Sequence, residues 1–440
     1  MGNDSKSFQA GQIIHYYENW VKMGAPEVIL KIIRGYRIPF VRKPPLITPK
    51  VNHKYQTQKS EAMTKIVQKM RAQGILQSVP PSPSFISHMF LIPKSDGSYR
   101  PIFNLKTLNS FVKAEPFRLI NMYRIPDFLQ PGDWLCKIDL SQAYFHLKIS
   151  KTHRRFLRLI YNGEVLEMTC LPFGLSTAPK TFSTLTNWIA QVLRQQKNIR
   201  ILVYLDDILV AHQNAAVLKK DVEITLNVLQ TLGWCVNWEK SVTTPQKSIT
   251  FLGVMWRTWD NLKSLPCEKI SKLKKKISLI LSQPQVTMKE VQSLVGMLNF
   301  ASFVVPRGRL HHRQLLRFMN SMLKCPLLGA TLPQPVRDEL KWWQHNCQLP
   351  TTLHFPPPTH FLTTDASDVA WGAQLDNISL SGPWCPKEKR LHCNLKEMLA
   401  ILHVIQSHGH NLSRSSVLIQ CDNQTVVAHL RKEGGQDQYH

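Results

Sequence analysis

The sequence predicts an α+β fold built from several domains, and three features of the chain support this prediction. Short apolar, β-branched stretches alternate with helical stretches as far as residue 256, and from residue 267 the pattern becomes helical. Strand-like stretches return after a proline-rich linker at residues 349–361. The chain has 440 residues, of which 43% are hydrophobic, so it can bury a substantial core. Its length fits roughly two to four domains.

The charge balance is strongly basic. Lys and Arg total 55 against 29 Asp and Glu, which gives a formal net charge of +26. An excess of this size indicates a polyanionic partner, because each phosphate that Lys or Arg neutralises releases condensed counterions. A basic surface that serves solubility alone is the other interpretation.

Features of secreted and membrane proteins are missing from the sequence. No stretch approaches the roughly 20 apolar residues that span a bilayer, no signal peptide opens the chain, and Lys6 stands where the myristoylation pattern needs Ser or Thr. The nine cysteines form no CxxC pairs, which predicts reduced thiols and neither a zinc site nor a disulfide framework. We therefore expect an intracellular protein, cytoplasmic or nuclear and not secreted, with no membrane partner.

The first part of the chain predicts an extension followed by strands and helices. Residues 1–59 combine short apolar patches with a basic, proline-bearing run, and we expect them to wrap other parts of the molecule. Residues 61–76 carry apolar residues near helical spacing and predict a helix. The stretch FLIPKSDGSYRPIFNL (90–105) predicts a hairpin with an Asp-Gly turn. Residues 134–149 predict a strand that runs into a turn or short helix.

Two further helices and two strand pairs follow. Residues 178–193 and 216–232 have helical patterns. Between them, ILVYLDDILVAH (201–212) predicts two strands joined by a tight turn. Residues 239–256 predict two more short strands.

From residue 267 the pattern predicts helices and then a second set of strands. In KISKLKKKISLIL (269–281) the apolar residues fall on one face and the lysines on the others. The stretch TMKEVQSLVGML (287–298) begins with a capping box that joins Thr287 to Glu290. Beyond the linker we expect strands at residues 361–375, a helix at 394–405, and a strand and helix at 416–432.

Two adjacent carboxylates, Asp206 and Asp207, interrupt an apolar run. Asp favours turns, but Asp-Asp lacks the glycine of the best two-residue hairpins. Two like charges beside apolar strands repel unless a cation lies between them, and Mg²⁺ prefers carboxylate oxygens. From these two residues alone, a plain turn and a metal site are equally good interpretations.

A third carboxylate favours the metal site. Asp139 ends another apolar strand in KIDLSQAYF. If the two strands are neighbours, the three carboxylates would hold two metals about 4 Å apart, which would activate a 3′-hydroxyl and stabilise a leaving pyrophosphate. Lys94 and Arg100 on the hairpin would then lie over an incoming triphosphate. Solvated charges on a hairpin tip are the plain alternative for these two cations.

These motifs resemble the ordered motifs of reverse transcriptases. The resemblance rests on YLDD, on Asp139 with Ala143 and Tyr144 after it, on LPFGLSTAPKTF (171–182) and on FLG (251–253), which occur in the family's order. It implies a right-hand polymerase with fingers, palm and thumb. Such an enzyme extends a DNA primer on an RNA template, accepts DNA templates as well, and uses dNTPs and Mg²⁺.

The resemblance also implies a metal site. Asp139, Asp206 and Asp207 would hold two Mg²⁺ ions, with the carbonyl of Leu140 as a further ligand. The FLG motif would help to form the primer grip.

For the nucleotide, the resemblance implies three contacts. Tyr144 would be a steric gate under the sugar that favours deoxynucleotides, although the residue alone suggests a core aromatic. Gly174 and its neighbouring backbone would pack against template and nucleotide. Phe173 stands where retroviral relatives carry glutamine, which removes the expectation of a glutamine contact to the nucleotide and leaves the metal chemistry unchanged.

The last segment is similar to the RNase H fold that follows many element-encoded reverse transcriptases. Asp365 follows a strand, Glu397 lies in a helix, and Asp422 ends another strand in IQCDN. The resemblance implies two further Mg²⁺ ions at these acids and cleavage of RNA in an RNA–DNA hybrid, with three unrelated surface acids as the alternative. The family uses a fourth acid on a later helix, for which Asp437 is a poor match. We therefore expect a C-terminally incomplete domain, and the nuclease activity stays open.

The expected domains are an extension (1–59), fingers and palm (60–255), a helical thumb (256–330), a connection (331–357) and an incomplete RNase H-like domain (358–440). In the thumb, the KLKKK stretch is expected to grip the backbone of the duplex, with a nuclear localisation signal as the alternative.

Three stretches indicate a branch of the family. FGLSTAPKTF, residues 295–315 and DNQTVVAHLRKEGG look most like the tyrosine-recombinase retroelements of the DIRS type. We therefore expect an RNA-directed and DNA-directed DNA polymerase that copies a retroelement RNA. The alternatives are a polymerase of another branch, such as a long-terminal-repeat element or a hepadnavirus-like enzyme, and a catalytically inactive, polymerase-derived protein that binds nucleic acid.

Overall fold

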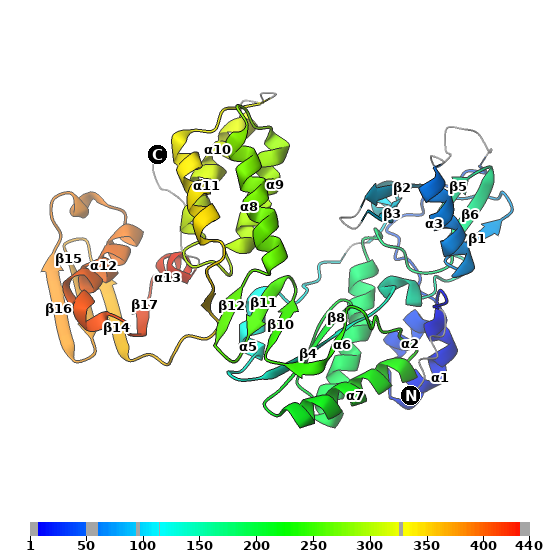
Figure 1. The fold of residues 1–440 in the computed structure, drawn as a ribbon, viewed down its shortest axis with the longest axis horizontal. Coiled ribbons are helices and arrows are strands. Elements are labelled where there is room, and N and C mark those ends of the chain that lie inside the picture. Colours follow the sequence, from blue (N-terminus) through cyan, green and yellow to red (C-terminus); the bar gives the residue numbers. More distant parts are fainter. Residues whose placement is uncertain (1–7, 50–59, 94–96, 114, 325–328, 432–440) are drawn as a thin grey trace. The chain divides into compact units, whose positions relative to one another are not determined.

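The computed structural model describes residues 8–49, 60–93, 97–113, 115–324 and 329–431. The chain divides into two compact units, Met1–Leu252 and Gly253–His440. Both units contain helices and sheets, so the mixed α and β fold that the sequence predicts is confirmed (Figure 1). The finer division into five domains stays a prediction.

A four-stranded antiparallel sheet, here called the central sheet, lies in the first unit. Its order is β7-β8-β4-β9, from Ile201–Tyr204, Asp207–His212, Trp134–Asp139 and Val242–Gln246. Helices α6 (Ala178–Lys197) and α7 (Ala215–Thr231) pack against it. Leu209 and Val210 point to opposite faces of β8, and both are fully buried, so this strand is covered on both sides.

The remaining sheets of the first unit are small. A three-stranded sheet has the order β1-β6-β5, and β2 pairs with β3 as a hairpin. These strands are Leu76–Val79, Glu164–Met168, Arg158–Tyr161, His88–Pro93 and Tyr99–Asn104. Helix α3 (Glu61–Ala72) starts at Ser60, whose hydroxyl accepts a hydrogen bond from the N–H of Met63 at 3.1 Å. The expected hairpin at 90–105 is confirmed. The helix expected at 61–76 is confirmed as far as Ala72, and Leu76 instead begins β1.

The N-terminal extension packs into the core of the first unit. It forms the 3₁₀ turn η1 (Gln12–Tyr16) and helices α1 (Tyr17–Lys22) and α2 (Glu27–Arg34). Trp20 is fully buried and stacks on Trp188 of α6 with the ring centroids 5.4 Å apart. Its Nε1 donates to the carbonyl of Leu232 at 3.0 Å. The buried side chains of this extension belong to one core with those of the central sheet, so the prediction that it wraps other parts is confirmed.

The second unit opens with short strands and helices. β11 pairs with β12 and β12 with β13, all antiparallel. The strands are Val254–Arg257, Leu262–Ser264 and Thr351–Thr352, and the helices are α8 (Cys267–Ser282), α9 (Met288–Ala301), α10 (Arg313–Lys324) and α11 (Gln334–Asn346). Helix α9 begins with the capping box of Thr287 and Glu290 that the sequence predicts. Leu273 and Ile277 of α8 are buried, as their spacing predicts.

The C-terminal part holds a sheet with the order β16-β15-β14-β17. Its strands are β14 (His360–Ala366), β15 (Ala370–Leu375), β16 (Ile378–Pro383) and β17 (Val417–Cys421). Helix α12 (Cys393–Leu412) lies between β16 and β17 in the chain, and α13 (Gln424–Arg431) follows β17. Leu362 of β14 packs in a small core with Ile401 and Val404 of α12. Strand β16 was not predicted from the sequence, although Ile378 and Leu380 alternate with two serines, because this pattern covers only four residues before Gly382 and Pro383.

Short elements complete the described chain. They are α4 (Lys106–Asn109), α5 (Ile125–Phe128), β10 (Ser248–Phe251), η3 (Met122–Arg124), η4 (Ala143–His146), η5 (Arg154–Phe156), η6 (Leu310–His312) and η7 (Glu388–Arg390). The stretch 239–256 forms three strands where two were expected, because β9 joins the central sheet and β10 does not. No helix in the described ranges is long and apolar enough to cross a membrane.

Candidate active sites

Three carboxylates meet at one end of the central sheet. β4 and β8 are antiparallel neighbours, and their register sets Asp139 directly opposite Asp207. β7 and β8 form a hairpin in which Tyr204 lies opposite Asp207, so the two turn residues are Leu205 and Asp206. The sequence pattern predicts both aspartates in the turn. That was wrong for Asp207, which is the first residue of β8.

The turn holds Leu205 in an unfavourable backbone conformation. Its φ is 54°, in the left-handed region that side chains other than glycine rarely adopt. The hairpin turns that match strand twist need this conformation, and glycine is their usual residue. The strain is about 1–3 kcal/mol, which is typical of functional sites. The N–H of Leu140 donates to the carbonyl of Asp206 at 3.0 Å and so ties the turn to the end of β4.

The electrostatics of this end of the sheet favour a bound cation. Burial raises the pKa of Asp206, and the charges of Asp207 and Asp139 raise it further. Burial also raises the pKa of Asp139, against the opposing charge of Lys240 and with the added repulsion of Asp207. The half-buried carboxylates therefore repel one another, and a cation between them would relieve both the repulsion and the loss of hydration.

Two lysines and one serine around the carboxylates were not predicted from the sequence. The Nζ of Lys137 lies 3.4 Å from a carboxylate oxygen of Asp207. Lys137 precedes Asp139 by two residues in one strand, so the period of two could have placed both side chains on one face. Lys240 had no such signal, because it lies far along the chain. In the same distant loop, the hydroxyl of Ser241 accepts from the N–H of Asp139 at 3.0 Å.

Tyr144 lies close to the carboxylates. It belongs to η4 and is buried between Phe173 and Phe182, with ring centroids 4.7 and 5.2 Å away. Burial raises its pKa to about 12, and the charge of Asp206 adds to this, so the phenol is neutral beside the carboxylates. Phe173 is 43% exposed and shields one side of the Tyr144 ring.

The expected triphosphate contacts are only partly described. Lys94 lies outside the described residues. Arg100 is exposed on β3, where it pairs with Ile92, below the tip of the hairpin. Gly174 has a φ of 94°, and a Cβ there would lie 3.0 Å from the carbonyl oxygen of Phe103 in β3. The loop that holds Gly174 therefore packs closely on the hairpin that carries Arg100.

A second set of acids lies in the C-terminal sheet. Asp365 is near the end of β14, and Asp422 follows β17. These two strands are parallel neighbours, with Thr364 opposite Cys421, so their carboxyl ends meet at one edge. Burial raises the pKa of Glu397 on α12, and the charges of Asp422 and Asp365 raise it further. The structure therefore brings all three acids together, as the sequence predicts.

Cys421 is an unexpected member of this acidic group. Ligand atoms of Glu397, Cys421 and Asp422 all lie within 4.8 Å of one another, and this is the one such group of three among the described residues. The thiol of Cys421 lies 3.9 Å from a carboxylate oxygen of Glu397. Asp139, Asp206 and Asp207 do not form so tight a group in the described part of the chain.

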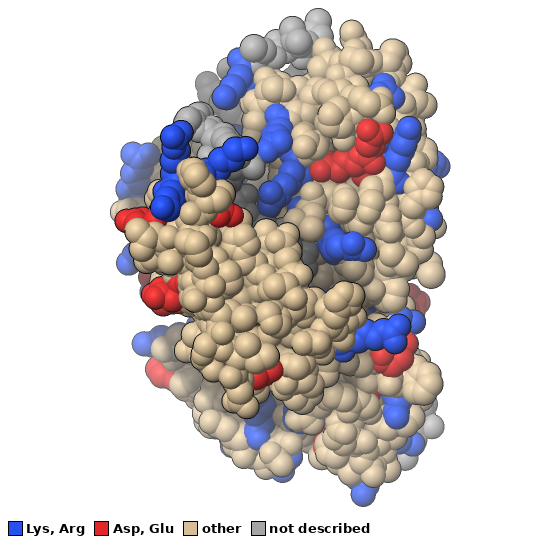
Figure 2. All heavy atoms as spheres, turned by 90° about the vertical axis from the view of Figure 1, so that its left-hand side faces the viewer, with Lys and Arg blue, Asp and Glu red and all other residues tan. Residues whose placement is uncertain are grey.

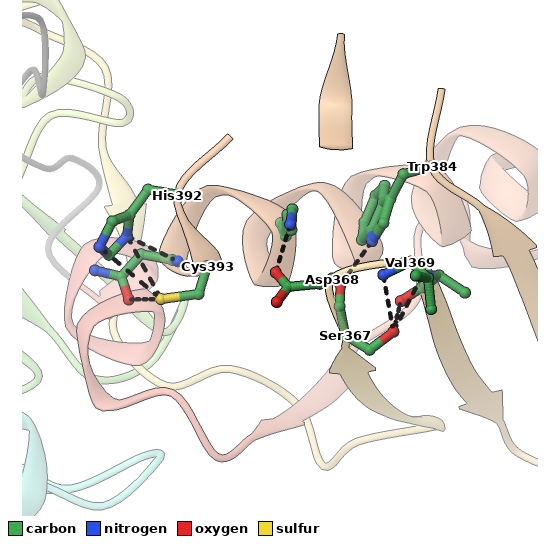
Figure 3. Close-up of polar contacts among 9 residues, drawn as sticks. Ser367, Asp368, Val369, Trp384, His392 and Cys393 are labelled. Atoms are coloured by element: carbon green, nitrogen blue, oxygen red, sulfur yellow. Dashed lines mark hydrogen bonds and ion pairs between the residues drawn. The ribbon is translucent and has the colours of Figure 1, made fainter. Parts of the chain in front are cut away.

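The loop after Asp365 is fixed to α12 (Figure 3). Asp368 forms an ion pair with the Nζ of Lys396 at 2.8 Å, and Lys396 is buried next to Glu397. In the same view the Nε1 of Trp384 donates to the carbonyl of Ser367 at 2.8 Å. The carboxylate of Asp368 is 96% exposed and is held by Lys396, so this acid fixes the loop and is not part of the group formed by Asp365, Glu397 and Asp422.

Comparisons with known proteins agree with this geometry. Residues 92–256 match the family model described as reverse transcriptase (RNA-dependent DNA polymerase). This range contains the three carboxylates of the central sheet. The chain is also 26% identical over 359 residues to the transposon Tf2-3 and Tf2-7 polyproteins of Schizosaccharomyces pombe. The match covers 78% of this chain and 26% of each polyprotein, so the chain spans about a quarter of the length of these relatives.

The fold is that of solved reverse transcriptases. A structure of the foamy viral protease-reverse transcriptase in complex with dsDNA aligns with a TM-score of 0.58 at 17% identity, over 97% of this chain and 92% of that one. A complex of the same protein with an RNA/DNA hybrid aligns with the same TM-score over 96% and 60%. Residues 92–256 therefore match a reverse transcriptase domain, and the chain is similar to retrotransposon polyproteins.

Proposed function

We propose that this protein is an RNA-directed DNA polymerase that also copies DNA and acts on the RNA of a retroelement. The register of β4 and β8 carries the proposal, because it sets Asp139 opposite Asp207 with Asp206 in the adjoining turn. Supporting this, the three acids lie within the part of the chain that matches the reverse transcriptase family. A plain hairpin turn does not explain the third carboxylate, which lies opposite Asp207 on another strand.

The carboxylates of the central sheet suit Mg²⁺. They offer hard oxygen donors, and their mutual repulsion and raised pKa values are the signs of negative charge without sufficient compensation. Asp139, Asp206 and Asp207, with the carbonyl of Leu140, would hold two ions, which would supply activation of the primer 3′-hydroxyl and stabilise the charge on the leaving pyrophosphate. Lys137 limits the negative charge at Asp207 and keeps its carboxylate oriented.

The nucleotide site is proposed to lie beside Tyr144. The ring is fixed by Phe173 and Phe182, so it cannot move aside for a ribose 2′-hydroxyl. Lys94 and Arg100 would neutralise the triphosphate, and Gly174 would let the backbone approach the template and nucleotide.

The proposed macromolecular partners are an RNA template, a DNA primer and their hybrid. The net charge of +26 supports a polyanionic partner. On the face shown in Figure 2, Lys and Arg side chains are spread widely, with Asp and Glu scattered between them. The foamy viral protein of the same fold was solved with dsDNA and with an RNA/DNA hybrid.

Primer extension separates an enzyme from an inactive nucleic-acid-binding protein. The wild-type chain is incubated with a labelled DNA primer on an RNA template, dNTPs and Mg²⁺. We expect extension to the template end, and extension on a DNA template as well. A wild-type protein that binds the primed template but never extends it would favour the inactive alternative.

Sugar selection tests the role of Tyr144. Tyr144→Val removes the ring, and Tyr144→Phe keeps it. We expect Tyr144→Val to weaken the preference for dNTPs over rNTPs by about 10–200-fold, the range that one steric contact supplies, and Tyr144→Phe to leave it unchanged. Equal preference in wild type and Tyr144→Val would remove Tyr144 from the sugar site.

The acids of the C-terminal sheet are proposed as an RNase H-like site. Asp365, Glu397 and Asp422 provide oxygen donors that suit two Mg²⁺ ions, which would direct water at a phosphate of RNA. The expected result is degradation of labelled RNA in a hybrid by the wild type and loss of it in Asp365→Asn. No cleavage at any Mg²⁺ or Mn²⁺ concentration would limit this segment to binding the hybrid. Asp437, the weak candidate for a fourth acid, lies outside the described residues.

Within the retroelements, we infer the DIRS-type branch from FGLSTAPKTF, residues 295–315 and DNQTVVAHLRKEGG. The similarity to the Tf2 polyproteins keeps a long-terminal-repeat element as the alternative. The flanking genomic sequence separates them, because a tyrosine recombinase gene beside the element supports the first branch and an integrase gene the second.

A further inference from the structure

A cleft of about 880 Å³ opens between the N-terminal extension and the chain that follows η4. One wall consists of α2 and the residues after it, up to Arg37. The other wall is residues 148–151 with Arg154. None of the residues that line the cleft belongs to the carboxylates or nucleotide contacts described above, so it is a separate feature of the first unit.

The lining of the cleft is strongly basic. Lys and Arg occupy six lining positions, and no described lining residue is acidic. These cations are Lys31, Arg34, Arg37, Lys148, Lys151 and Arg154. Arg34 is paired with Glu27, and the Nε of buried Arg154 donates to the carbonyl of Ile149 at 3.1 Å. Six cations on two facing walls create a positive potential, which attracts phosphate groups.

The two walls are joined by the backbone, so the cleft exists before a ligand arrives. Tyr36 pairs with Ile149 in a parallel bridge. The N–H of Tyr36 donates to the carbonyl of Lys148 at 2.8 Å, and the N–H of Ser150 donates to the carbonyl of Tyr36 at 2.9 Å. A Cβ at Gly35, whose φ is 151°, would lie 3.3 Å from the Cα of Ser150, so glycine permits this close approach. A preformed site costs little ordering entropy on binding.

We propose that this cleft binds the phosphate backbone of a single-stranded nucleic acid. Cations on both walls suit a chain of phosphates, and the apolar surface from Ile14, Val28 and Ile32 with the ring of Tyr36 suits the bases. A volume of about 880 Å³ is in the range for small ligands, so it admits a few linked nucleotides of one strand. A duplex keeps its bases stacked inside the helix, so it cannot place them on these apolar side chains as a single strand can.

The binding measurement uses the full chain and two variants that change the net charge equally. Lys31→Glu with Lys151→Glu alters exposed lysines of the cleft, one on each wall. Lys219→Glu with Lys220→Glu alters exposed lysines of α7 outside the cleft. The probe is a fluorescein-labelled oligothymidylate, and a labelled blunt duplex DNA is measured in parallel.

We expect the cleft variant to bind the single strand at least about 10-fold more weakly than the control variant, while both bind the duplex alike. The plot of log K against log salt for the single strand should lose about 1.4 in slope, because each phosphate contact contributes about 0.7. Equal weakening in the two variants would overturn the proposal, because it would reflect net charge alone. If the Glu variant fails to fold, Lys31→Gln with Lys151→Gln is tested by the same slope.

Inorganic tripolyphosphate serves as the competitor for a small-anion site. We expect tripolyphosphate to act only through ionic strength, so it should displace the oligothymidylate no better than NaCl does at the same ionic strength. Displacement at micromolar concentration would show a site for a small polyphosphate and overturn the single-strand proposal. This test can fail independently of the polymerase proposal. On a primed template whose template strand extends only one nucleotide beyond the primer, both variants should extend the primer equally. A failed polymerase would instead give no extension in the wild type.

Discussion

At the scale of single residues, the carboxylates of the central sheet are costly to the folded protein. Asp139 and Asp206 are half-buried, and each feels the negative charge of Asp207. A carboxyl group whose folded pKa is raised destabilises the protein as the pH rises through that pKa, because the unfolded chain releases its proton more easily. The cost is therefore present at pH values above the folded pKa, and a bound cation reduces it.

The first prediction follows from this cost. Without divalent metal at pH 7, Asp206→Asn should melt at a higher temperature than the wild type, because it removes one of the repelling charges. Added Mg²⁺ should raise the melting temperature of the wild type, since a ligand that binds only the folded state stabilises it, and should raise that of the variant less. Differential scanning fluorimetry measures both shifts. Asp127→Asn, a change in an exposed surface pair, is the control and should follow the wild type.

His146 is a residue whose pH behaviour is set by the fold. It is fully buried, and burial lowers its pKa to about 4. Its Nε2 accepts a hydrogen bond from the N–H of Cys235 at 3.0 Å, so its Nδ1 carries the proton and donates to the carbonyl of Ala143 at 3.0 Å. The neutral ring thereby connects η4, which carries Tyr144, to the chain that flanks the carboxylate end of β4.

The second prediction concerns acid stability. Because the folded pKa of His146 lies below its unfolded value near 6.5, its contribution is complete above pH 6.5 and falls as the pH drops toward 4. Between pH 6.5 and 5 this contribution falls by about 2 kcal/mol. Urea unfolding at pH 7 and pH 5 measures the total loss, and His146→Gln should lose about 2 kcal/mol less over this interval. An equal loss in both proteins would show that His146 is protonated in the folded state.

Sequence patterns predicted the acidic residues but not their surroundings. Asp139, Asp206 and Asp207 followed from apolar strands interrupted by charge, and the pairing of β4 with β8 confirmed that they are neighbours. The supporting residues His146 and Ser241 had no local signal, because they act through contacts with residues distant in sequence. Cys421 points toward Glu397 only because β17 lies beside β14, a parallel pairing that no local pattern encodes.

At the scale of elements, the N-terminal extension acts as part of the core. Trp20 of α1 lies against Trp188 of α6 and near Trp234, and its N–H reaches the end of α7. The buried side chains of the extension belong to the same core as those of the central sheet, so its order depends on that sheet and its helices. The sequence predicted this dependence from the short apolar patches, but it could not name the surface that they cover.

The third prediction tests this packing. Trp20→Ala should lower the free energy of unfolding by about 3–5 kcal/mol, the usual loss for a fully buried tryptophan. Val21→Ala, at the next position of the same helix and 42% exposed, should change it by no more than about 0.5 kcal/mol. Urea unfolding followed by tryptophan fluorescence and circular dichroism measures both. A small effect of Trp20→Ala would mean that the extension is not part of the core.

Element boundaries were predicted best where a cap or turn marks them. The capping box at Thr287 placed the start of α9 correctly, whereas the helix predicted at residues 61–76 ends at Ala72, before Gly74. Asp207 was assigned to the turn because sequence alone favours Asp there, whereas the register puts the left-handed residue at Leu205. Tertiary pairing thus decided the turn against the local preference of the residues.

At the scale of the whole molecule, a basic chain carries two acidic sites. The net charge of +26 favours long-range attraction of nucleic acid. Each unit also holds a cluster of acidic residues, which are Asp139, Asp206 and Asp207 in the first and Asp365, Glu397 and Asp422 in the second. Divalent cations bound to these acidic clusters would offset the repulsion between their carboxylates and a phosphate backbone. Composition predicted a polyanionic partner, and the motifs predicted the two acidic clusters. The basic cleft beside α2 could not be predicted in this way, because its walls lie more than a hundred residues apart in the sequence.

The proposed role of the carboxylates of the central sheet in templated DNA synthesis can be measured by single-turnover extension. A DNA primer on an RNA template is extended in Mg²⁺ by the wild type, Asp206→Asn and Asp127→Asn. We expect extension by Asp206→Asn to be slower by about 10³-fold or more, since losing a metal ligand forfeits several kcal/mol of transition-state stabilisation, and extension by Asp127→Asn to be unchanged. Extension by Asp206→Asn at the wild-type rate would show that this carboxylate takes no part in the chemistry.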